Sequence, residues 1–85
     1  MKDENTKIID TDSVKDKNTR FTLMKICEDL LERGYNPLKQ ISSYLVSGDP
    51  GYISSYKECR NRILEFKREE IIELMLKSYV GLWDI

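Results

Sequence analysis

Few side chains in this sequence are suited to catalysis or to metal binding. Its 85 residues include no histidine, which excludes a histidine general base, a histidine-assisted nucleophile and a His–Cys metal site. The two cysteines, Cys27 and Cys59, are too few for a thiol zinc site or a disulfide framework. The adjacent acids Glu69 and Glu70 would point to different sides of a helix, so they do not form an acid–base pair. We therefore expect a protein that binds a partner, is not an enzyme, and holds neither a metal nor a cofactor.

Thr6 and Thr11 are candidates for covalent modification. Both lie beside charged residues near the N-terminus, where we expect them to be accessible. Phosphorylation of either residue would add about 1.5 to 2 negative charges, enough to redirect a mobile segment toward an arginine cluster. The physics permits this role without indicating it, because most exposed threonines are merely solvated.

A second candidate site is the segment around residues 48–51, which read GDPG. Two glycines, a proline and an aspartate that can bond its own backbone are strong turn chemistry. Such a segment can be a binding loop or a connector between helices, and turn-forming residues alone favour the connector. Nearby tyrosines either pack the loop onto helices or form an aromatic patch of the kind enriched in interfaces. The residues of this candidate interaction loop are Tyr44, Gly48, Asp49, Pro50 and Tyr52.

The elements that position these residues begin after a charged segment. Nine of the first 17 residues are charged, so this segment cannot bury enough apolar surface to offset the entropy of ordering it. We predict a disordered tail over residues 1–17 and a single helical domain over residues 18–85. No apolar run approaches the ~20 residues of a membrane span, and the N-terminus has no apolar signal core. We expect no membrane insertion and a cytoplasmic location.

Helical periodicity predicts the first two helices of the domain. The first begins near Asn18 and ends before Gly34, which suits a left-handed cap. The second follows Asn36 and Pro37, an N-cap residue with proline at the first helical position, and ends at residues 47–48.

Two further helices are predicted in the C-terminal half. A capping box, Ser55-x-x-Glu58, should open the third helix. The apolar residues change face across the charged run 67–70, which favours a break there and a fourth helix ending before Gly81. We expect Cys27 and Cys59 to be buried small hydrophobes on different helices. The predicted fold class is all-α, a small bundle of about four short helices. A chain of this size buries little apolar surface, and homodimerisation would bury more of it.

A DNA-binding helix-turn-helix dimer is the alternative function. Basic residues occur along the predicted third helix, but they spread around it rather than lining one edge. The chain has 14 basic and 15 acidic residues, a formal charge of −1, which makes nucleic-acid binding unfavourable.

Two segments at fixed spacing resemble a known family. Residues 33–41 read RGYNPLKQI and residues 44–53 read YLVSGDPGYI. They are similar to the signature of the IreB family, approximately KGYNPINQI…GYLLSGDPAYI. Residues 68–73, REEIIE, and 77–80, KSYV, resemble the family ending RDEIIEEL…KSYL. The resemblance covers residues 18–80 without a visible gap.

The resemblance implies a small helical regulatory phosphoprotein of low-GC Gram-positive bacteria that forms a homodimer. It implies phosphorylation on an N-terminal threonine by a membrane Ser/Thr kinase with extracellular PASTA repeats, in cell-envelope stress and cephalosporin resistance. The family's T-x-x-F-D motif aligns with residues 6–10, TKIID, so Thr6 is the matching threonine and Thr11 the weaker candidate. A downstream protein partner is implied without being identified.

The sequence departs from the family pattern at several positions. Ile9 replaces the aromatic residue of the threonine motif, which weakens the expectation of kinase recognition there. Gly51 stands where alanine is usual, Ser43 where glycine is usual, and Cys59 where alanine is usual. The last five residues have no counterpart in the family pattern, and Trp83 either packs across a dimer interface or lies on the surface.

Overall fold

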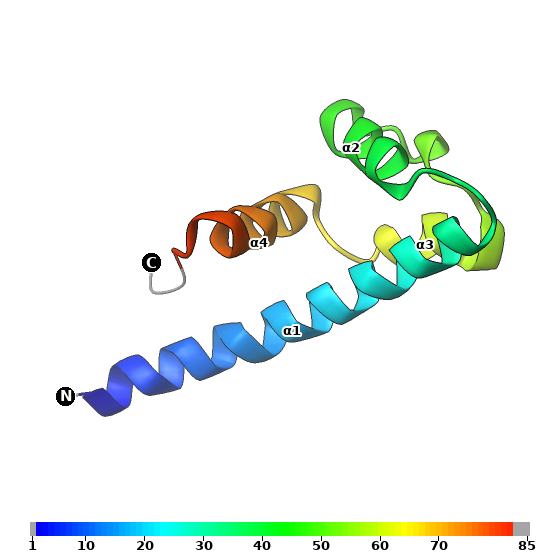
Figure 1. Cartoon of the computed structure of the whole chain (residues 1–85). Coiled ribbons are helices and arrows are strands. Elements are labelled where there is room, and N and C mark those ends of the chain that lie inside the picture. Colours follow the sequence, from blue (N-terminus) through cyan, green and yellow to red (C-terminus); the bar gives the residue numbers. More distant parts are fainter. Residues whose placement is uncertain (1, 83–85) are drawn as a thin grey trace.

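The computed structural model describes the backbone of residues 2–82 and the side chains of residues 14–82. Four α-helices and two 3₁₀ turns make up this part of the chain, which contains no strand (Figure 1). The helices are α1 (Lys2–Glu32), α2 (Pro37–Ser47), α3 (Cys59–Ile63) and α4 (Arg68–Val80), and the turns are η1 (Pro50–Tyr52) and η2 (Tyr56–Glu58). The all-helical class and the four helices predicted from the sequence are confirmed.

The first helix is longer than the sequence predicts. Its backbone is helical from Lys2, whereas the periodicity begins near Asn18. Lys15 and Asp16, inside the predicted tail, lie in α1 and form ion pairs with α4. The partners, Glu70 and Lys77, lie far from residues 15–16 in the sequence. A local sequence pattern therefore cannot reveal that contacts with α4 order this part of the chain. The domain boundary after residue 17 stays a prediction.

The turn between α1 and α2 forms as predicted. Gly34 has a φ of +87°, and its N–H donates to the Leu31 carbonyl at 2.9 Å. The next N–H, of Tyr35, donates to the Leu30 carbonyl at 2.9 Å, which completes a Schellman cap. The Asn36 side chain then accepts from the Lys39 N–H at 3.2 Å, and α2 begins at the proline after it.

The capping box predicted at Ser55 is wrong. Ser55 has helical backbone angles and its side chain makes no capping hydrogen bond. Lys57 and Glu58 both have positive φ, +49° and +61°, so the chain breaks between η2 and α3. The Glu58 carboxylate accepts from the Asn61 side chain at 2.6 Å instead of from a capped backbone N–H. As a result α3 has five residues and starts at Cys59.

Contacts from α1 hold this left-handed corner. The Lys57 ammonium lies 2.8 Å from a Glu32 carboxylate oxygen. Arg62 donates both to Asp29, at 2.8 Å, and to the Lys57 carbonyl, at 2.9 Å. Non-glycine residues adopt left-handed angles when surrounding structure fixes them. Here the fixing groups come from a helix more than twenty positions earlier, which explains why the sequence pattern missed the corner.

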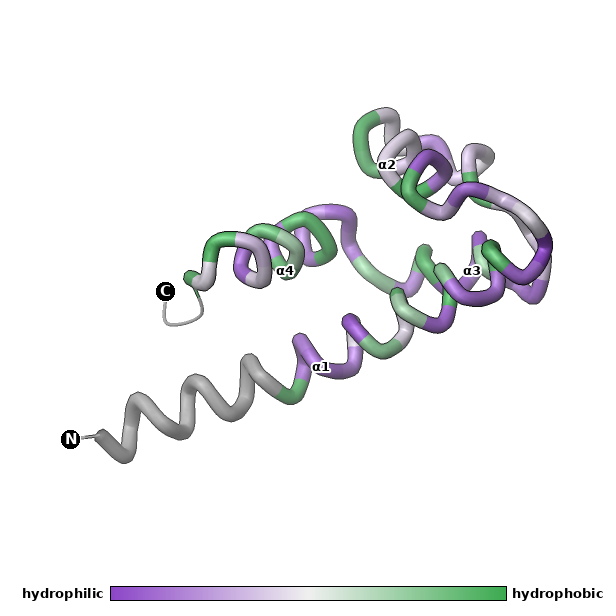
Figure 2. The backbone as a smooth tube through the Cα atoms, in the orientation of Figure 1, coloured by the Kyte–Doolittle hydropathy of each residue, from purple (hydrophilic) through white to green (hydrophobic). Residues whose placement is uncertain are grey.

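The break before α4 is confirmed. α3 ends at Ile63 and α4 begins at Arg68, so the charged run 67–70 contains the start of a new helix. A Glu70 carboxylate oxygen accepts from the Lys67 N–H at 3.1 Å and caps that start. Gly81, with a φ of +74°, ends the helix. Figure 2 shows hydrophobic residues recurring along α4 after a hydrophilic first turn.

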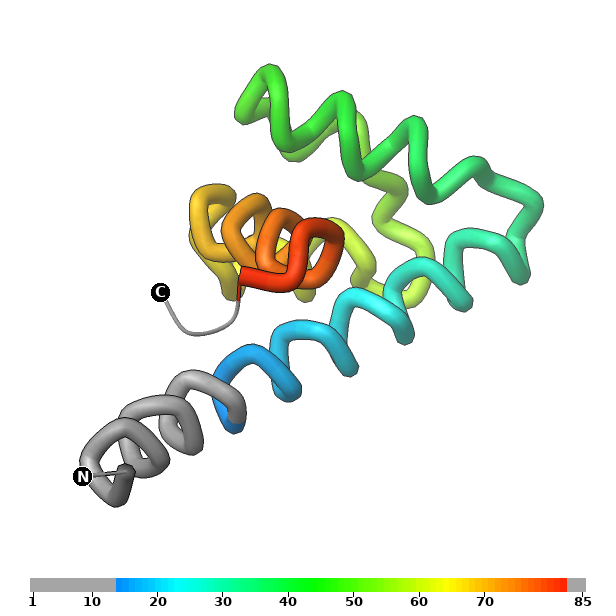
Figure 3. The backbone as a smooth tube through the Cα atoms, turned by 60° about the vertical axis from the view of Figure 1, so that its left-hand side comes forward, coloured from blue at the N-terminus to red at the C-terminus, as the bar shows by residue number. Residues whose placement is uncertain are grey.

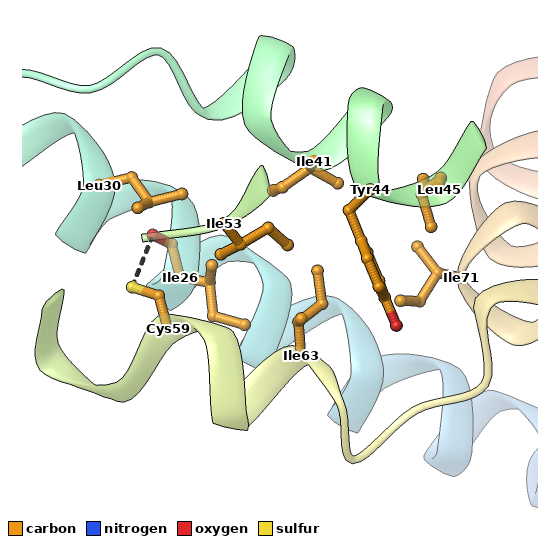
Figure 4. Packing of buried hydrophobic residues seen from close by; sticks show 9 residues of the cluster. All are labelled: Ile26, Leu30, Ile41, Tyr44, Leu45, Ile53, Cys59, Ile63 and Ile71. Carbon is orange, nitrogen blue, oxygen red and sulfur yellow. Dashed lines mark hydrogen bonds between the residues drawn. The ribbon is translucent and has the colours of Figure 1, made fainter. Parts of the chain in front are cut away.

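α2 and α4 lie on the same side of α1 in two views (Figures 1 and 3). α2 lies toward the C-terminal half of α1, and α4 lies farther toward its N-terminal half. The hydrophobic core contains residues from all four helices and from the loop after η1 (Figure 4). Its buried members are Ile26, Leu30, Ile41, Tyr44, Leu45, Ile53, Cys59, Ile63 and Ile71.

Candidate regulatory site

The segment that carries Thr6 and Thr11 leads into a pair of ion pairs between α1 and α4. The Lys15 ammonium lies 2.9 Å from a Glu70 carboxylate oxygen. The next residue, Asp16, lies 3.4 Å from the Lys77 ammonium. We call these four residues the α1–α4 clasp. Since their charges alternate along each helix, the clasp fixes the register of α4 on α1 as well as its proximity.

The clasp surrounds a small polar hollow. The hollow has a volume of about 260 Å³, and Thr19, Glu73 and Leu74 line it together with the clasp. Thr19 is buried, and its hydroxyl donates to the Lys15 carbonyl at 3.0 Å. Hydrogen bonds from the Lys15 side chain and the Lys67 backbone lower the pKa of the Glu70 carboxyl. Glu70 is therefore ionised at neutral pH, as the ion pair requires.

The candidate interaction loop is anchored to α4. Gly48 has a φ of +80° and its N–H donates to the Tyr44 carbonyl at 2.7 Å, which ends α2. The Arg68 guanidinium donates to the Leu45 carbonyl at 3.0 Å and lies against Gly48. Asp49 accepts from the Gly51 N–H at 2.9 Å and starts η1. A cation at the C-terminus of α2 also complements the helix dipole.

The predicted residues of this loop divide between surface and core. Gly48, Asp49, Pro50 and Tyr52 follow one another at the surface, with half of the Tyr52 side chain exposed. Tyr44 is 4% exposed and lies in the core, pointing toward Ile71 (Figure 4). Tyr44 packs beneath the loop, inside the core, and its side chain has almost no exposed surface with which to contact a partner.

The predicted recognition helix for DNA does not form. α3 has five residues, and its two arginines contact the protein itself. Arg60 donates to the Ile53 carbonyl at 2.9 Å, and Arg62 donates to Asp29. A recognition helix needs free side chains along several turns to contact base edges.

Comparison with protein families identifies the chain's relatives. The model of the family described as IreB regulatory phosphoprotein matches residues 4–81. The chain belongs to the IreB regulatory phosphoprotein family. This match confirms the resemblance carried by residues 33–53, and it includes the clasp, the loop and both candidate threonines.

The side chains of Thr6 and Thr11 lie outside the described residues. The backbone at both positions belongs to α1. Thr11 precedes Lys15 by four residues, and Thr6 precedes it by nine. The clasp and the Arg68 contact were not predicted, because each joins residues whose separation in sequence has no periodic signature. In this IreB chain, the available signal was the run of charged residues at 15–17, KDK, and at 67–70, KREE, each of which contains both signs of charge.

The cysteines of this IreB chain are free, and their thiols are packed rather than activated. Cys59 is buried, and its thiol lies 3.9 Å from the Ile26 carbonyl (Figure 4). Cys27 is half-buried. Burial raises the pKa of both thiols above the ordinary value, which keeps them protonated at neutral pH. Within residues 14–82, no group of three acidic, cysteine or histidine side chains is placed to hold a metal ion.

Among the residues that the structure describes, no helix is both long enough and apolar enough to cross a membrane.

Proposed function

We propose that this protein is a non-catalytic regulator switched by phosphorylation of a threonine before Val14. The donor would be a membrane Ser/Thr kinase with PASTA repeats, and the setting cell-envelope stress and cephalosporin resistance signalling in the cytoplasm. The observation that carries the proposal is the family match, which begins at residue 4 and so includes Thr6 and Thr11. Thr6 occupies the position of the family's threonine motif, and Thr11 is the second candidate.

The clasp gives phosphorylation a route to the helical body. Along a helix, residues four apart share a face, so Thr11 lies on the face of Lys15. Thr6 lies about two and a half turns before Lys15, on the opposite face. A phosphate carries up to about two negative charges and three acceptor oxygens, and it would compete with Glu70 for the Lys15 ammonium. Phosphorylation at Thr11 would then loosen α4 from α1.

A second copy of the chain is the first proposed partner. Three residues of α4 at helical spacing, Ile72, Met75 and Tyr79, form an apolar face, and Tyr79 is 91% exposed. Exposed apolar faces of this kind mark protein–protein contacts. A chain of 85 residues also has a small core, so burial of this face between two copies would stabilise it. The kinase and a downstream protein are the other partners.

The experiment is phosphorylation of the full chain by such a kinase, followed by phosphosite mapping with mass spectrometry. We expect phosphate on Thr6, on Thr11, or on both. The variants Thr6→Ala and Thr11→Ala assign the site, and a pull-down with Thr6→Ala and Thr6→Glu identifies proteins whose binding depends on it. Absence of phosphate from residues 1–17 would eliminate the switch. Light scattering tests the homodimer, because a concentration-independent mass near 10.0 kDa would rule it out.

A further inference from the structure

A groove runs along the last two turns of α4, beside the face formed by Ile72, Met75 and Tyr79. Its volume is about 400 Å³. The apolar residues Leu76, Val80 and Leu82 line it, and each side chain is about half exposed (51–56%). Glu73 and Lys77 form its polar edge. The groove shares Glu73 and Lys77 with the clasp hollow, and none of its lining residues belongs to the core or to the loop.

The chain leaves α4 beside this groove. Gly81 has left-handed backbone angles, φ +74° and ψ +28°, and its N–H donates to the Lys77 carbonyl at 2.8 Å. A left-handed residue at this position ends a helix. Leu82, the next residue, is consequently one of the groove's own lining residues. The residue that follows is Trp83, the one tryptophan in the sequence, which lies outside the described residues. Consecutive Cα atoms of any chain are about 3.8 Å apart, so Trp83 is attached at the end of the groove.

We infer that the indole of Trp83 docks into this groove of its own chain, against Leu76 and Val80. Tryptophan has the largest apolar area of any side chain, and burial of about 150–250 Å² drives such rings into apolar sites. The Lys77 ammonium at the groove's edge adds a cation that can interact with the face of the ring. Asp16 already holds Lys77 in place through the clasp, so the cation is positioned before the ring arrives.

The chain's own tryptophan is favoured over a second molecule as the occupant. A separate chain loses translational and rotational freedom on binding, whereas Trp83 is already tethered beside the groove. The docked ring closes this face of α4 and leaves Ile72, Met75 and Tyr79 as the apolar face open to a partner. This inference does not depend on phosphorylation or on the proposed kinase.

The single tryptophan makes the test direct. Fluorescence excited selectively at the indole reports Trp83 alone, with acrylamide as the quencher. We expect the folded full-length chain to emit at shorter wavelength and to be quenched less than the same chain in urea. Leu76→Asp places a charge in the groove and should abolish that protection. Val46→Asp is the matched control, because it puts the same charge at an exposed position of another helix, α2, outside the groove, and it should leave the protection unchanged.

Three results would overturn the inference. One is quenching of the folded wild-type chain equal to that of the unfolded chain. Another is protection that survives Leu76→Asp in a variant whose circular dichroism shows intact helices. The third is protection that disappears on dilution, since the occupant would then belong to another copy. If Leu76→Asp does not fold, nuclear Overhauser contacts between the indole protons and the Leu76 and Val80 methyl groups decide the matter in the wild-type chain. Their presence supports docking, and their absence contradicts it.

Discussion

Replacement of Gly48 by alanine tests whether Arg68 fixes the interaction loop to α4. Gly48 and Gly34 both have left-handed φ values, +80° and +87°. An added Cβ at Gly34 would meet no atom within 4 Å, whereas at Gly48 it would lie 2.9 Å from Cζ of Arg68. Gly34→Ala therefore measures the backbone cost alone, and Gly48→Ala adds displacement of the guanidinium.

The structure gives the size of each contribution. A left-handed residue with a Cβ costs roughly 1–2 kcal/mol. The smaller conformational freedom of alanine in the unfolded chain returns about 0.4–1 kcal/mol. We expect Gly34→Ala to destabilise by about 1 kcal/mol. The guanidinium is the end of a flexible side chain, so it can move, but it must then give up its 3.0 Å bond to the Leu45 carbonyl. Loss of that partly exposed bond should add about 1 kcal/mol for Gly48→Ala.

Urea unfolding monitored by circular dichroism, at one protein concentration for all variants, measures both free energies of unfolding. The Arg68→Met background supplies the control, because the extra cost of Gly48→Ala should disappear there. Independent substitutions add within about 0.3–0.5 kcal/mol. If Gly48→Ala and Gly34→Ala lower the free energy of unfolding equally within that margin, both in the wild-type background and in the Arg68→Met background, the role given to the guanidinium is refuted.

Three other predictions concern α4. Ile71→Ala should lower the free energy of unfolding by about 2–5 kcal/mol, because this fully buried side chain joins α4 to the core; a calorimetric or urea measurement showing a loss below ~1 kcal/mol would contradict that packing. The folded-state pKa of Glu70 lies below its ordinary value of 4.5, so its contribution to stability is complete above that pH and is lost as the pH falls through the folded pKa. Glu70→Gln should therefore make stability less sensitive to acid below pH 4.5, where the Glu70 carboxylate of the wild-type chain becomes protonated, and an unchanged pH profile of the thermal midpoint would count against the Lys15 contact. If two copies pair through Ile72, Met75 and Tyr79 as proposed, Tyr79→Asp should lower the mass measured by light scattering at a fixed concentration, whereas Val46→Asp, at an exposed position of α2, should not.

Predictions that depended on neighbouring residues were the most accurate. The Gly34 cap, the Asn36–Pro37 start of α2 and the end of α4 at Gly81 all formed where the sequence placed them. At each of these positions the chain's own backbone and adjacent side chains supply the hydrogen bonds. The GYNP and SGDPGYI segments also sufficed to indicate the family, because their letters and spacing are fixed by the chain alone.

Positions controlled by distant residues could not be predicted in the same way. Ser55 and Glu58 have the spacing of a capping box, yet contacts from Asp29 and Glu32 hold Lys57 and its neighbour in a left-handed corner. Tyr44 occurs near the loop in sequence, but its place on the inner face of α2 puts it in the core.

The sequence by itself determined the helical class, the caps at Gly34 and Gly81, and the absence of histidine chemistry. Tertiary structure decided that Lys15 and Asp16 meet Glu70 and Lys77, and that Arg68 reaches the end of α2. The physical reason is the separation in sequence between the residues that interact. A cap or a helical period is set within a few residues, whereas an ion pair between α1 and α4 exists only after the core has brought the two helices together.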